Sequence, residues 1–161
     1  MGRDKKPDLK GMSLPEIEAL VRDLGEPSYR AKQIAAWIFQ RDVSDFQEMT
    51  DLSKALRTRL AGVACVTRAR GVDTARSSAD ETAKLLLEFA DGARVESVLL
   101  RDEDRLTGCV STQVGCRFAC SFCATGSMGF IRNLTTGEIV EQVLELRRLA
   151  SPDRLGNLVY M

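Results

Sequence analysis

Apolar side chains recur every three or four residues in three stretches of the first 62 residues, which is the periodicity of amphipathic helices. The first stretch opens with Ser13-Leu-Pro-Glu16, a capping box with proline inside the first turn. Serine caps and glycine stops bound the stretches, so the connections are short. We therefore predict a small helical bundle over residues 1–62, with one further turn near Phe46. The predicted helices span residues 13–25, 27–39 and 53–62.

From Val63 onward the pattern changes to the shorter alternation that is typical of strands. Ala90-Asp91-Gly92 is a turn signal between two of these stretches, and residues 71–80 form a polar loop. We predict a small antiparallel sheet of three or four strands, in which residues 63–104 link the helical bundle to the remainder. The predicted strands are 63–70, 82–89, 94–100 and 106–113.

Thr135-Thr-Gly-Glu138 is a second capping box, and it opens a long helix with a broad apolar face. A loop over 151–156 and a buried strand over 157–161 are predicted to follow. A strand, a loop, a helix and a second strand in this order form one βαβ unit of a parallel sheet. The fold class is therefore α+β followed by α/β, with segments 1–62, 63–104 and 105–161. One such unit cannot cover both faces of a parallel sheet, so we expect the chain to be the N-terminal piece of a longer protein.

The composition is that of an ordinary globular protein, because 44% of residues are hydrophobic and 29% are charged. No run approaches the roughly 20 apolar residues that a membrane span requires. The charged start, without an apolar run behind it, argues against a signal peptide. We therefore expect a cytoplasmic monomer with reduced thiols and no membrane partner.

Basic and acidic residues balance at 23 each, which argues against a nucleic-acid binder that uses its whole surface. Residues 54–76, however, carry six basic residues and one acidic residue. Such a segment could contact phosphates, or it could be a solvated helix end and strand face. Trp37 likewise could stack on a base or lie at the edge of the core. The six basic residues are Lys54, Arg57, Arg59, Arg68, Arg70 and Arg76.

Three of the five cysteines, Cys116, Cys120 and Cys123, lie within eight residues at the spacing C-x3-C-x2-C. Three thiolates form a soft ligand set that suits iron–sulfur or zinc. A [4Fe–4S] cluster held by three thiolates would keep one iron open to a small molecule. Zinc with Cys109 as fourth ligand is an alternative, although structural zinc usually shows two separated ligand pairs and the chain has no histidine. An electron-transfer protein is another, although carriers usually supply four thiolates per cubane.

The sequence around these cysteines resembles one family closely. The matching stretches are Cys109-Val-Ser-Thr-Gln-Val-Gly-Cys116, Cys120-Ser-Phe-Cys123-Ala-Thr-Gly and Gly129-Phe-Ile-Arg-Asn-Leu134. They are similar to those of the radical S-adenosylmethionine (SAM) RNA adenine-C2 methyltransferases, the RlmN/Cfr group. The resemblance implies a [4Fe–4S] cluster and SAM as cofactors, and a partial (β/α) barrel that starts in residues 105–161. It also implies large-subunit ribosomal RNA, and in some members transfer RNA, as substrate, and an electron donor as partner.

The resemblance further implies roles for individual residues. The three clustered cysteines would be the cluster ligands, and Phe122 would lie near the adenine of SAM. Cys109 would resolve a protein–RNA crosslink by forming a transient disulfide with a methyl-carrying cysteine that is not among the five here. Glu96 would accept the C2 proton of adenine, a step that requires a positioned base. From periodicity alone, Cys109 is a small buried strand residue and Glu96 a polar residue on an outer strand face.

The same resemblance implies that the helical bundle is an accessory domain that helps to hold RNA. Because the methyl-carrying cysteine is missing, we expect this chain alone to be inactive. Within the same chemistry, a relative that acts at C8 of adenine is the alternative. In a different class, the alternative is a cysteine-ligated zinc module that binds RNA without catalysis.

Overall fold

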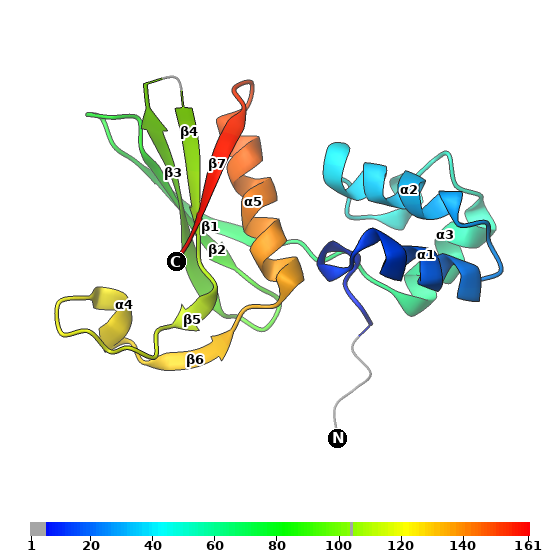
Figure 1. Cartoon of the computed structure of the whole chain (residues 1–161), viewed down its shortest axis with the longest axis horizontal. Coiled ribbons are helices and arrows are strands. Elements are labelled where there is room, and N and C mark those ends of the chain that lie inside the picture. Colours follow the sequence, from blue (N-terminus) through cyan, green and yellow to red (C-terminus); the bar gives the residue numbers. More distant parts are fainter. Residues whose placement is uncertain (1–5, 104) are drawn as a thin grey trace. The chain divides into compact units, whose positions relative to one another are not determined.

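The computed structural model describes residues 6–103 and 105–161. The chain divides into two compact units, with unit 1 ending at Arg68 and unit 2 beginning at Ala69 (Figure 1). The sequence predicts segments 1–62, 63–104 and 105–161, whereas in the structure residues 63–68 belong to unit 1 and the rest of the second segment forms one unit with the third. Within the described residues, no helix has the length and apolar character needed to cross a membrane.

Unit 1 is helical, as the periodicity predicts. Its capping residues act as expected, because the Glu16 carboxylate accepts hydrogen bonds from the Ser13 N–H at 2.7 Å and from the Ser13 hydroxyl. The Ser53 hydroxyl accepts the Leu56 N–H at 3.2 Å. The elements are η1 (Leu9–Gly11), α1 (Leu14–Asp23), α2 (Tyr29–Ala35), the π-helical turn η2 (Ala36–Gln40), η3 (Phe46–Glu48) and α3 (Lys54–Val63).

The core of unit 1 is formed by the predicted apolar stripes. Each helix of this unit contributes side chains that are inaccessible to solvent, and the turn η3 adds its own. Trp37 is partly buried against this cluster, as the edge-of-core alternative predicts. The largest fully buried side chains of the cluster are Leu9, Ile17, Ile34, Ile38, Met49, Leu56 and Leu60.

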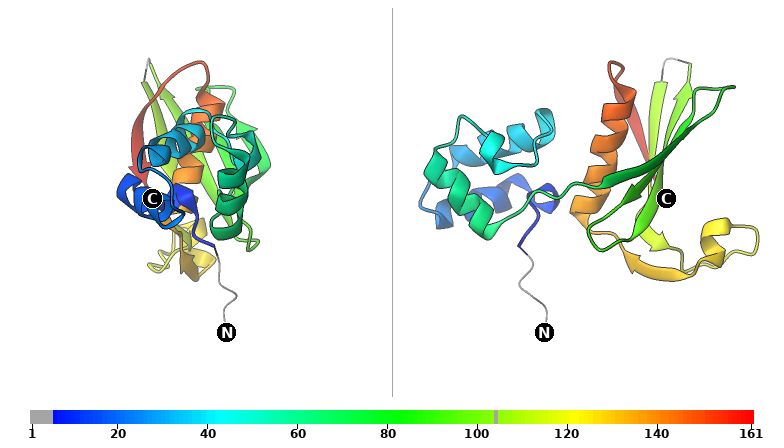
Figure 2. Two further views of the ribbon diagram at one scale, coloured as in Figure 1. Left: turned by 90° about the vertical axis from the view of Figure 1, so that its right-hand side faces the viewer. Right: turned by 180° about the vertical axis from the view of Figure 1, so that it is seen from behind.

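Unit 2 is built on a five-stranded mixed sheet in the order β1-β2-β3-β4-β7. The first four strands are antiparallel neighbours, whereas β7 pairs with β4 in parallel. The parallel pair and the helix between its strands form the predicted βαβ unit, with α5 (Thr136–Ala150) along one face of the sheet (Figures 1 and 2). The strands are β1 (Arg70–Arg76), β2 (Ala83–Glu88), β3 (Arg94–Asp102), β4 (Arg105–Val110) and β7 (Leu155–Tyr160).

The face of the sheet under α5 is its buried face. Burial alternates residue by residue along β2, β3 and β4, as a strand with one covered face requires. Gly108 lies on this face, where an added Cβ would come within 2.9 Å of Leu146 Cδ1 on α5. Glycine at this position therefore permits the close approach of helix and sheet.

Three of the predicted strands differ from the structure. The predicted strand 63–70 and loop 71–80 are wrong, since α3 runs to Val63 and β1 occupies Arg70–Arg76. β1 is an edge strand with only one partly buried residue, so backbone pairing rather than an apolar pattern forms it. The predicted strand 106–113 ends at Val110, and residues 113–115 join a separate hairpin. The predicted buried strand 157–161 is mostly exposed, because β7 is the other edge of the sheet.

Candidate metal centre and active-site residues

The three clustered cysteines lie on a loop that follows β4 and is held at both ends by a hairpin. The hairpin pairs β5 (Gln113–Gly115) with β6 (Phe130–Asn133), and the short helix α4 (Ala124–Ser127) lies between them (Figure 1). The Cys116 N–H donates to the Gly129 carbonyl at 3.1 Å, and the Cys123 N–H donates to the Cys120 carbonyl at 3.0 Å. The sequence predicts an irregular loop here but not the hairpin that closes it.

Two glycines allow the backbone to close around this loop. Gly115 has φ +73°, and a Cβ there would stand 1.8 Å from the Gly129 carbonyl oxygen. Gly126 is buried, and its Cβ would stand 2.9 Å from the Cys120 backbone nitrogen. Any side chain at either position would therefore push the two sides of the loop apart.

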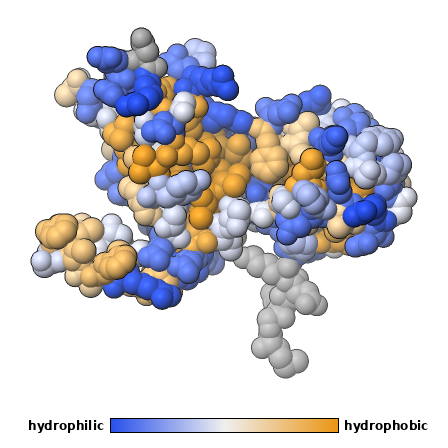
Figure 3. Space-filling model, in the orientation of Figure 1, coloured by the Kyte–Doolittle hydropathy of each residue, from blue (hydrophilic) through white to orange (hydrophobic). Residues whose placement is uncertain are grey.

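The thiols of the loop are free and reachable. Cys120 is exposed, while Cys116 and Cys123 are half-buried. Phe122 is 91% exposed, and the neighbouring Phe118 is 85% exposed, so the loop has the hydrophobic surface that Figure 3 shows. Among the residues that the structure describes, no group of three or more His, Cys, Asp or Glu side chains is arranged to hold a metal ion. The three thiols thus lie on one closed loop, but their sulfur atoms are not gathered around a common point. As a set of donor atoms, three thiolates suit an iron–sulfur cluster.

Arg132 ties the hairpin to two other elements. Its guanidinium makes a bidentate contact with Glu138 in the first turn of α5, with both N···O distances at 2.8 Å. Its Nε donates to Asp91, in the turn between β2 and β3, at 2.8 Å. We call Arg132, Asp91 and Glu138 the Arg132 cluster. The sequence predicts no role for Arg132, because the capping box that contains Glu138 does not indicate a pairing with this arginine, and Asp91 is distant in the chain.

These contacts determine the charge states of Glu138, Asp91 and Arg132. Partial burial opposes the charge on Glu138, but the hydrogen bonds from Arg132 and from the Thr135 N–H outweigh it and lower the pKa of this carboxyl. The same balance of burial against hydrogen bonds, here from the Ala93 N–H and Arg132, lowers the pKa of Asp91. Hydrogen bonding to Glu138 raises the pKa of Arg132. The Arg132 cluster is therefore fully charged at neutral pH.

A second polar network lies buried between α5 and the sheet, centred on Gln142. This side chain is inaccessible to solvent, and its Oε1 accepts hydrogen bonds from the Ser97 hydroxyl at 2.9 Å and from the Ser111 N–H at 2.8 Å. Its Nε2 donates to the Ser111 carbonyl at 3.0 Å. This network was not predicted, although the polar Gln142 stands between Ile139 and Leu146 on the apolar stripe of the helix, which indicates a buried polar group.

Glu96 and Cys109 lie on neighbouring strands, and their side chains share the face of the sheet opposite α5. The register pairs Val98 with Cys109, so Glu96, two residues from Val98, points to the same side. Cys109 is a half-buried free thiol. The Glu96 carboxylate is about half exposed and forms an ion pair with Lys84 at 2.9 Å. The hydrogen bond from Lys84 to the Glu96 carboxylate, and secondly the negative charge of Glu96, raise the pKa of Lys84.

Nearby carboxylates neutralise part of the basic segment 54–76. Arg59 is paired with Glu26, Arg68 with Asp42 at 3.0 Å, and Arg70 with Glu88 at 2.6 Å. Half of the six basic side chains therefore have carboxylate partners. This arrangement favours the solvated-surface alternative over a phosphate-binding strip.

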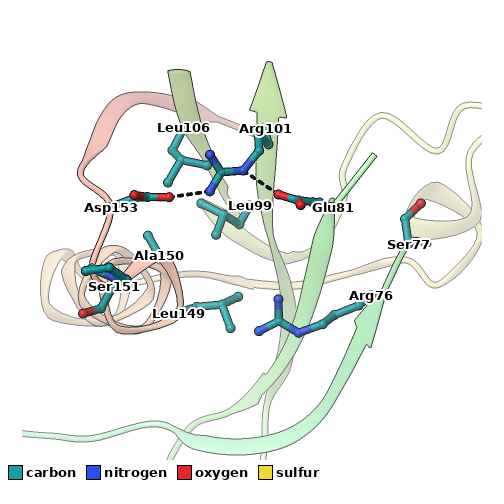
Figure 4. Close-up of a pocket in the computed structure, with 11 residues that line it drawn as sticks. Arg76, Ser77, Glu81, Leu99, Arg101, Leu106, Leu149, Ala150, Ser151 and Asp153 are labelled. Carbon is teal, nitrogen blue, oxygen red and sulfur yellow. Dashed lines mark hydrogen bonds and ion pairs between the residues drawn. The ribbon is translucent and has the colours of Figure 1, made fainter. Parts of the chain in front are cut away.

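A cavity of about 370 Å³ lies at the end of the sheet where β3 finishes and β4 begins (Figure 4). Leucines from β3, β4 and α5 line it, and Arg101 spans its rim between Glu81 at 2.8 Å and Asp153. The cysteine loop instead follows the other end of β4. None of the six site residues predicted from the sequence lines this cavity, so it is separate from the candidate site.

Comparison with known proteins defines the class first. A crystal structure of a radical SAM methyltransferase from Sphaerobacter thermophilus superposes with a TM-score of 0.86 at 42% sequence identity. The match covers 94% of this chain and 45% of that one. The fold of this chain is therefore that of the corresponding part of this radical SAM methyltransferase structure.

Comparison with sequence relatives identifies the family within this class of methyltransferases. Residues 7–66 match the family described as the ribosomal RNA large subunit methyltransferase N-terminal domain. The probable dual-specificity RNA methyltransferase RlmN of Thermotoga sp. (strain RQ2) is 47% identical over 96% of this chain. The dual-specificity RNA methyltransferase RlmN of Geotalea uraniireducens is 44% identical over 98% of it. The chain belongs to the RlmN family, and it spans 45% of the length of each of these two relatives.

Proposed function

We propose that this chain is the part of a radical SAM RNA methyltransferase that carries the cluster loop. The reaction would place a methyl group on C2 of adenine in large-subunit ribosomal RNA and, as a second substrate, in transfer RNA. The observation that carries the proposal is the loop of three free thiols, closed by the β5–β6 hairpin and by glycines that admit no side chain. The family membership supports the RNA substrate.

In this proposal, Cys116, Cys120 and Cys123 hold a [4Fe–4S] cluster, and the strand β4 begins the partial barrel. When bound, the cluster supplies the open iron and the electron for the radical chemistry of SAM. Three thiolates on one short loop would leave one iron of such a cluster without a protein ligand. Phe122, with its ring 91% exposed, is free to contact the adenine of SAM.

Glu96 would act as the base that removes the C2 proton of adenine. Its carboxylate is reachable from solvent, and the ion pair with Lys84 holds it on the outer face of the sheet. The backbone beneath it is fixed from the next strand, since the Ser111 hydroxyl donates to the Glu96 carbonyl at 2.8 Å. Position and accessibility are thus both compatible with the role.

Cys109 would release the product. Its thiolate would attack the sulfur of a cysteine outside this chain that is joined to the RNA through a methylene group. A sulfur–sulfur bond forms as the sulfur–carbon bond breaks, the carbon keeps the electron pair, and a proton completes the methyl group. Cys109 and Glu96 lie on the same face of the sheet. This arrangement supports the roles proposed for the thiol and the carboxylate, because both groups would act on one adenine.

Anaerobic reconstitution with iron and sulfide tests the proposal. We expect about four irons per chain and a reduced [4Fe–4S] signal in electron paramagnetic resonance that shifts when SAM is added. Replacement of Cys116, Cys120 and Cys123 by serine should abolish both iron and signal. The matched control is Cys65→Ser, because the Cys65 thiol lies in unit 1 against the Lys6 and Pro7 carbonyls. Zinc bound by the same three cysteines, with no reducible cluster, would contradict the proposal.

A further inference from the structure

One side of the continuous helix formed by α2 and η2 carries two aromatic side chains and two arginines. Positions 29, 33, 37 and 41 are four residues apart, so they follow one side of the helix, and position 30 lies beside them. The opposite side buries Ala31, Ile34 and Ile38 in the core. We call this side the aromatic–arginine patch; it consists of the exposed Tyr29 and Arg41 and the half-buried Arg30, Gln33 and Trp37.

Within this patch, the arginines stack on the aromatic rings. The guanidinium carbon of Arg41 lies 4.1 Å from the centroid of the Trp37 ring, and that of Arg30 lies 5.0 Å from the Tyr29 ring. The indole is fixed, because it packs on the core and its Nε1–H donates to the Asp51 carboxylate at 2.5 Å. A guanidinium stacked in this way still presents its outer flat face to a further planar group.

The charge of these arginines differs from that of two other arginines of unit 1. Arg59 and Arg68 each have a carboxylate partner. In the described part of the chain, Arg30 and Arg41 have no ion pair, and the hydrogen bonds of Arg30 go to neutral oxygen atoms. Among the residues that the structure describes, Asp51 is the one carboxylate that hydrogen-bonds to the patch, and it accepts from the indole N–H. The patch therefore keeps a net positive charge beside exposed aromatic surface.

We propose that the aromatic–arginine patch binds unpaired RNA bases, which stack on the Tyr29 ring and on the Arg41 guanidinium. Tyr29 is 54% exposed, so one face of its ring is open to a base. Proteins that bind single-stranded nucleic acid combine positive charge with such stacking surfaces. In a duplex, base faces are covered by their neighbours and cannot stack in this way. The inference rests on the proposed function, in which RNA is the substrate. It adds which surface of unit 1 contacts the RNA and that the contacted RNA is unpaired.

The chain provides its own reporter for this contact, since Trp37 is its only tryptophan. We would titrate the 161-residue chain with a fluorescein-labelled, unstructured RNA oligonucleotide and with an RNA duplex of the same length. The single strand should change the Trp37 fluorescence with the same midpoint as the anisotropy of the label. The duplex should bind at least about fivefold more weakly, since it offers no unstacked base.

Four variants locate the interaction. Tyr29→Ala and Arg41→Ala should each weaken single-strand binding by about fivefold or more. Arg41→Lys keeps the charge but loses the flat guanidinium, so it should weaken binding about as much as Arg41→Ala. Arg22→Ala removes one exposed positive charge from α1 and should change the affinity by less than about twofold. Far-UV circular dichroism of all four variants checks that unit 1 remains folded.

Equal effects of Arg22→Ala and Arg41→Ala would overturn the proposal, because charge alone would then explain the binding. Equal affinity for duplex and single strand would overturn it as well, and so would a chain that binds no RNA. Cluster assembly separates these failures from a failure of the proposed function. A chain that assembles the cluster and binds RNA equally well in wild-type and patch-variant form refutes the patch alone.

Discussion

Replacement of Gln142 by leucine would leave three polar groups without partners between α5 and the sheet. The Ser97 hydroxyl and both backbone groups of Ser111 hydrogen-bond to this one amide. Leucine is similar in size to glutamine and suits the apolar neighbours, so the substitution removes hydrogen bonds without opening a large cavity. The loss of stability should therefore come from the polar groups.

The magnitude follows from the burial of each group. A buried donor or acceptor that loses its only partner costs about 1–3 kcal/mol. Ser97 is fully buried, whereas the contacts to Ser111 are partly buried and can recover some hydration. Counting about 1 kcal/mol for each of the three groups gives a destabilisation of unit 2 of about 3 kcal/mol.

Amide hydrogen exchange is the suitable assay because it resolves the two units. A loss of about 3 kcal/mol should accelerate exchange of the best protected amides of β3 and β4 by roughly 100-fold. The amides of α1 and α3 in unit 1 serve as the internal control and should not change. The double variant Ser97→Ala/Gln142→Leu should regain about 1 kcal/mol, since the stranded hydroxyl is also removed.

Acceleration of less than about threefold in β3 and β4 would refute this reasoning. It would mean that water or other side chains replace Gln142 at little cost. Faster exchange in unit 1 by the same factor would refute it in another way, since the effect would then not be local to the α5 interface. No regain in the double variant would show that the Ser97 hydroxyl is not the stranded group.

The closed loop and the Arg132 cluster lead to two further predictions. Gly115→Ala should abolish iron uptake in reconstitution, because its Cβ would meet the Gly129 carbonyl, whereas Gly92→Ala, at φ +82° with nothing within 4 Å, should retain it. Equal iron uptake by both variants would contradict the close-approach argument. Arg132→Gln should lower the melting temperature of unit 2 at pH 7, and this difference should shrink as the pH is lowered below 4.5. Because folding lowers the pKa of Glu138, the ion pair contributes its full stabilisation above the usual pKa of 4.5 and loses it as the pH falls through the pKa of the folded state. A difference in melting temperature between variant and wild type that does not shrink at low pH would argue against the ion pair.

Local signals in the sequence predicted the elements that depend on local chemistry. The capping boxes at Ser13 and Thr135 mark the starts of α1 and α5, and the turn at Ala90-Asp91-Gly92 joins β2 and β3. Elements that depend on distant partners were not predicted. β1 is exposed along most of its length and forms by pairing with β2, and the hairpin around the cysteines joins two segments of three and four residues.

In the candidate site, too, local features were predicted from the sequence and features that depend on distant segments were not. The spacing of the cysteines is a property of the chain alone, so the sequence was enough to single out the loop. The common face of Glu96 and Cys109 depends on the register between β3 and β4, which a single strand does not encode. The partners of Arg132 depend on the folded path of three segments, and no local sequence pattern predicts the partners of an isolated arginine.

Ser111 connects the buried network to the face that carries Glu96 and Cys109. It follows directly after the last residue of β4, where the strand ladder to β3 ends. Its backbone N–H and carbonyl bind Gln142 on the helix side, and its hydroxyl binds the Glu96 carbonyl at 2.8 Å. The packing of α5 therefore helps to fix the backbone beneath Glu96 through one residue. A change confined to the buried side, such as Gln142→Leu, should for this reason also disturb the outer face on which the proposed base and thiol lie.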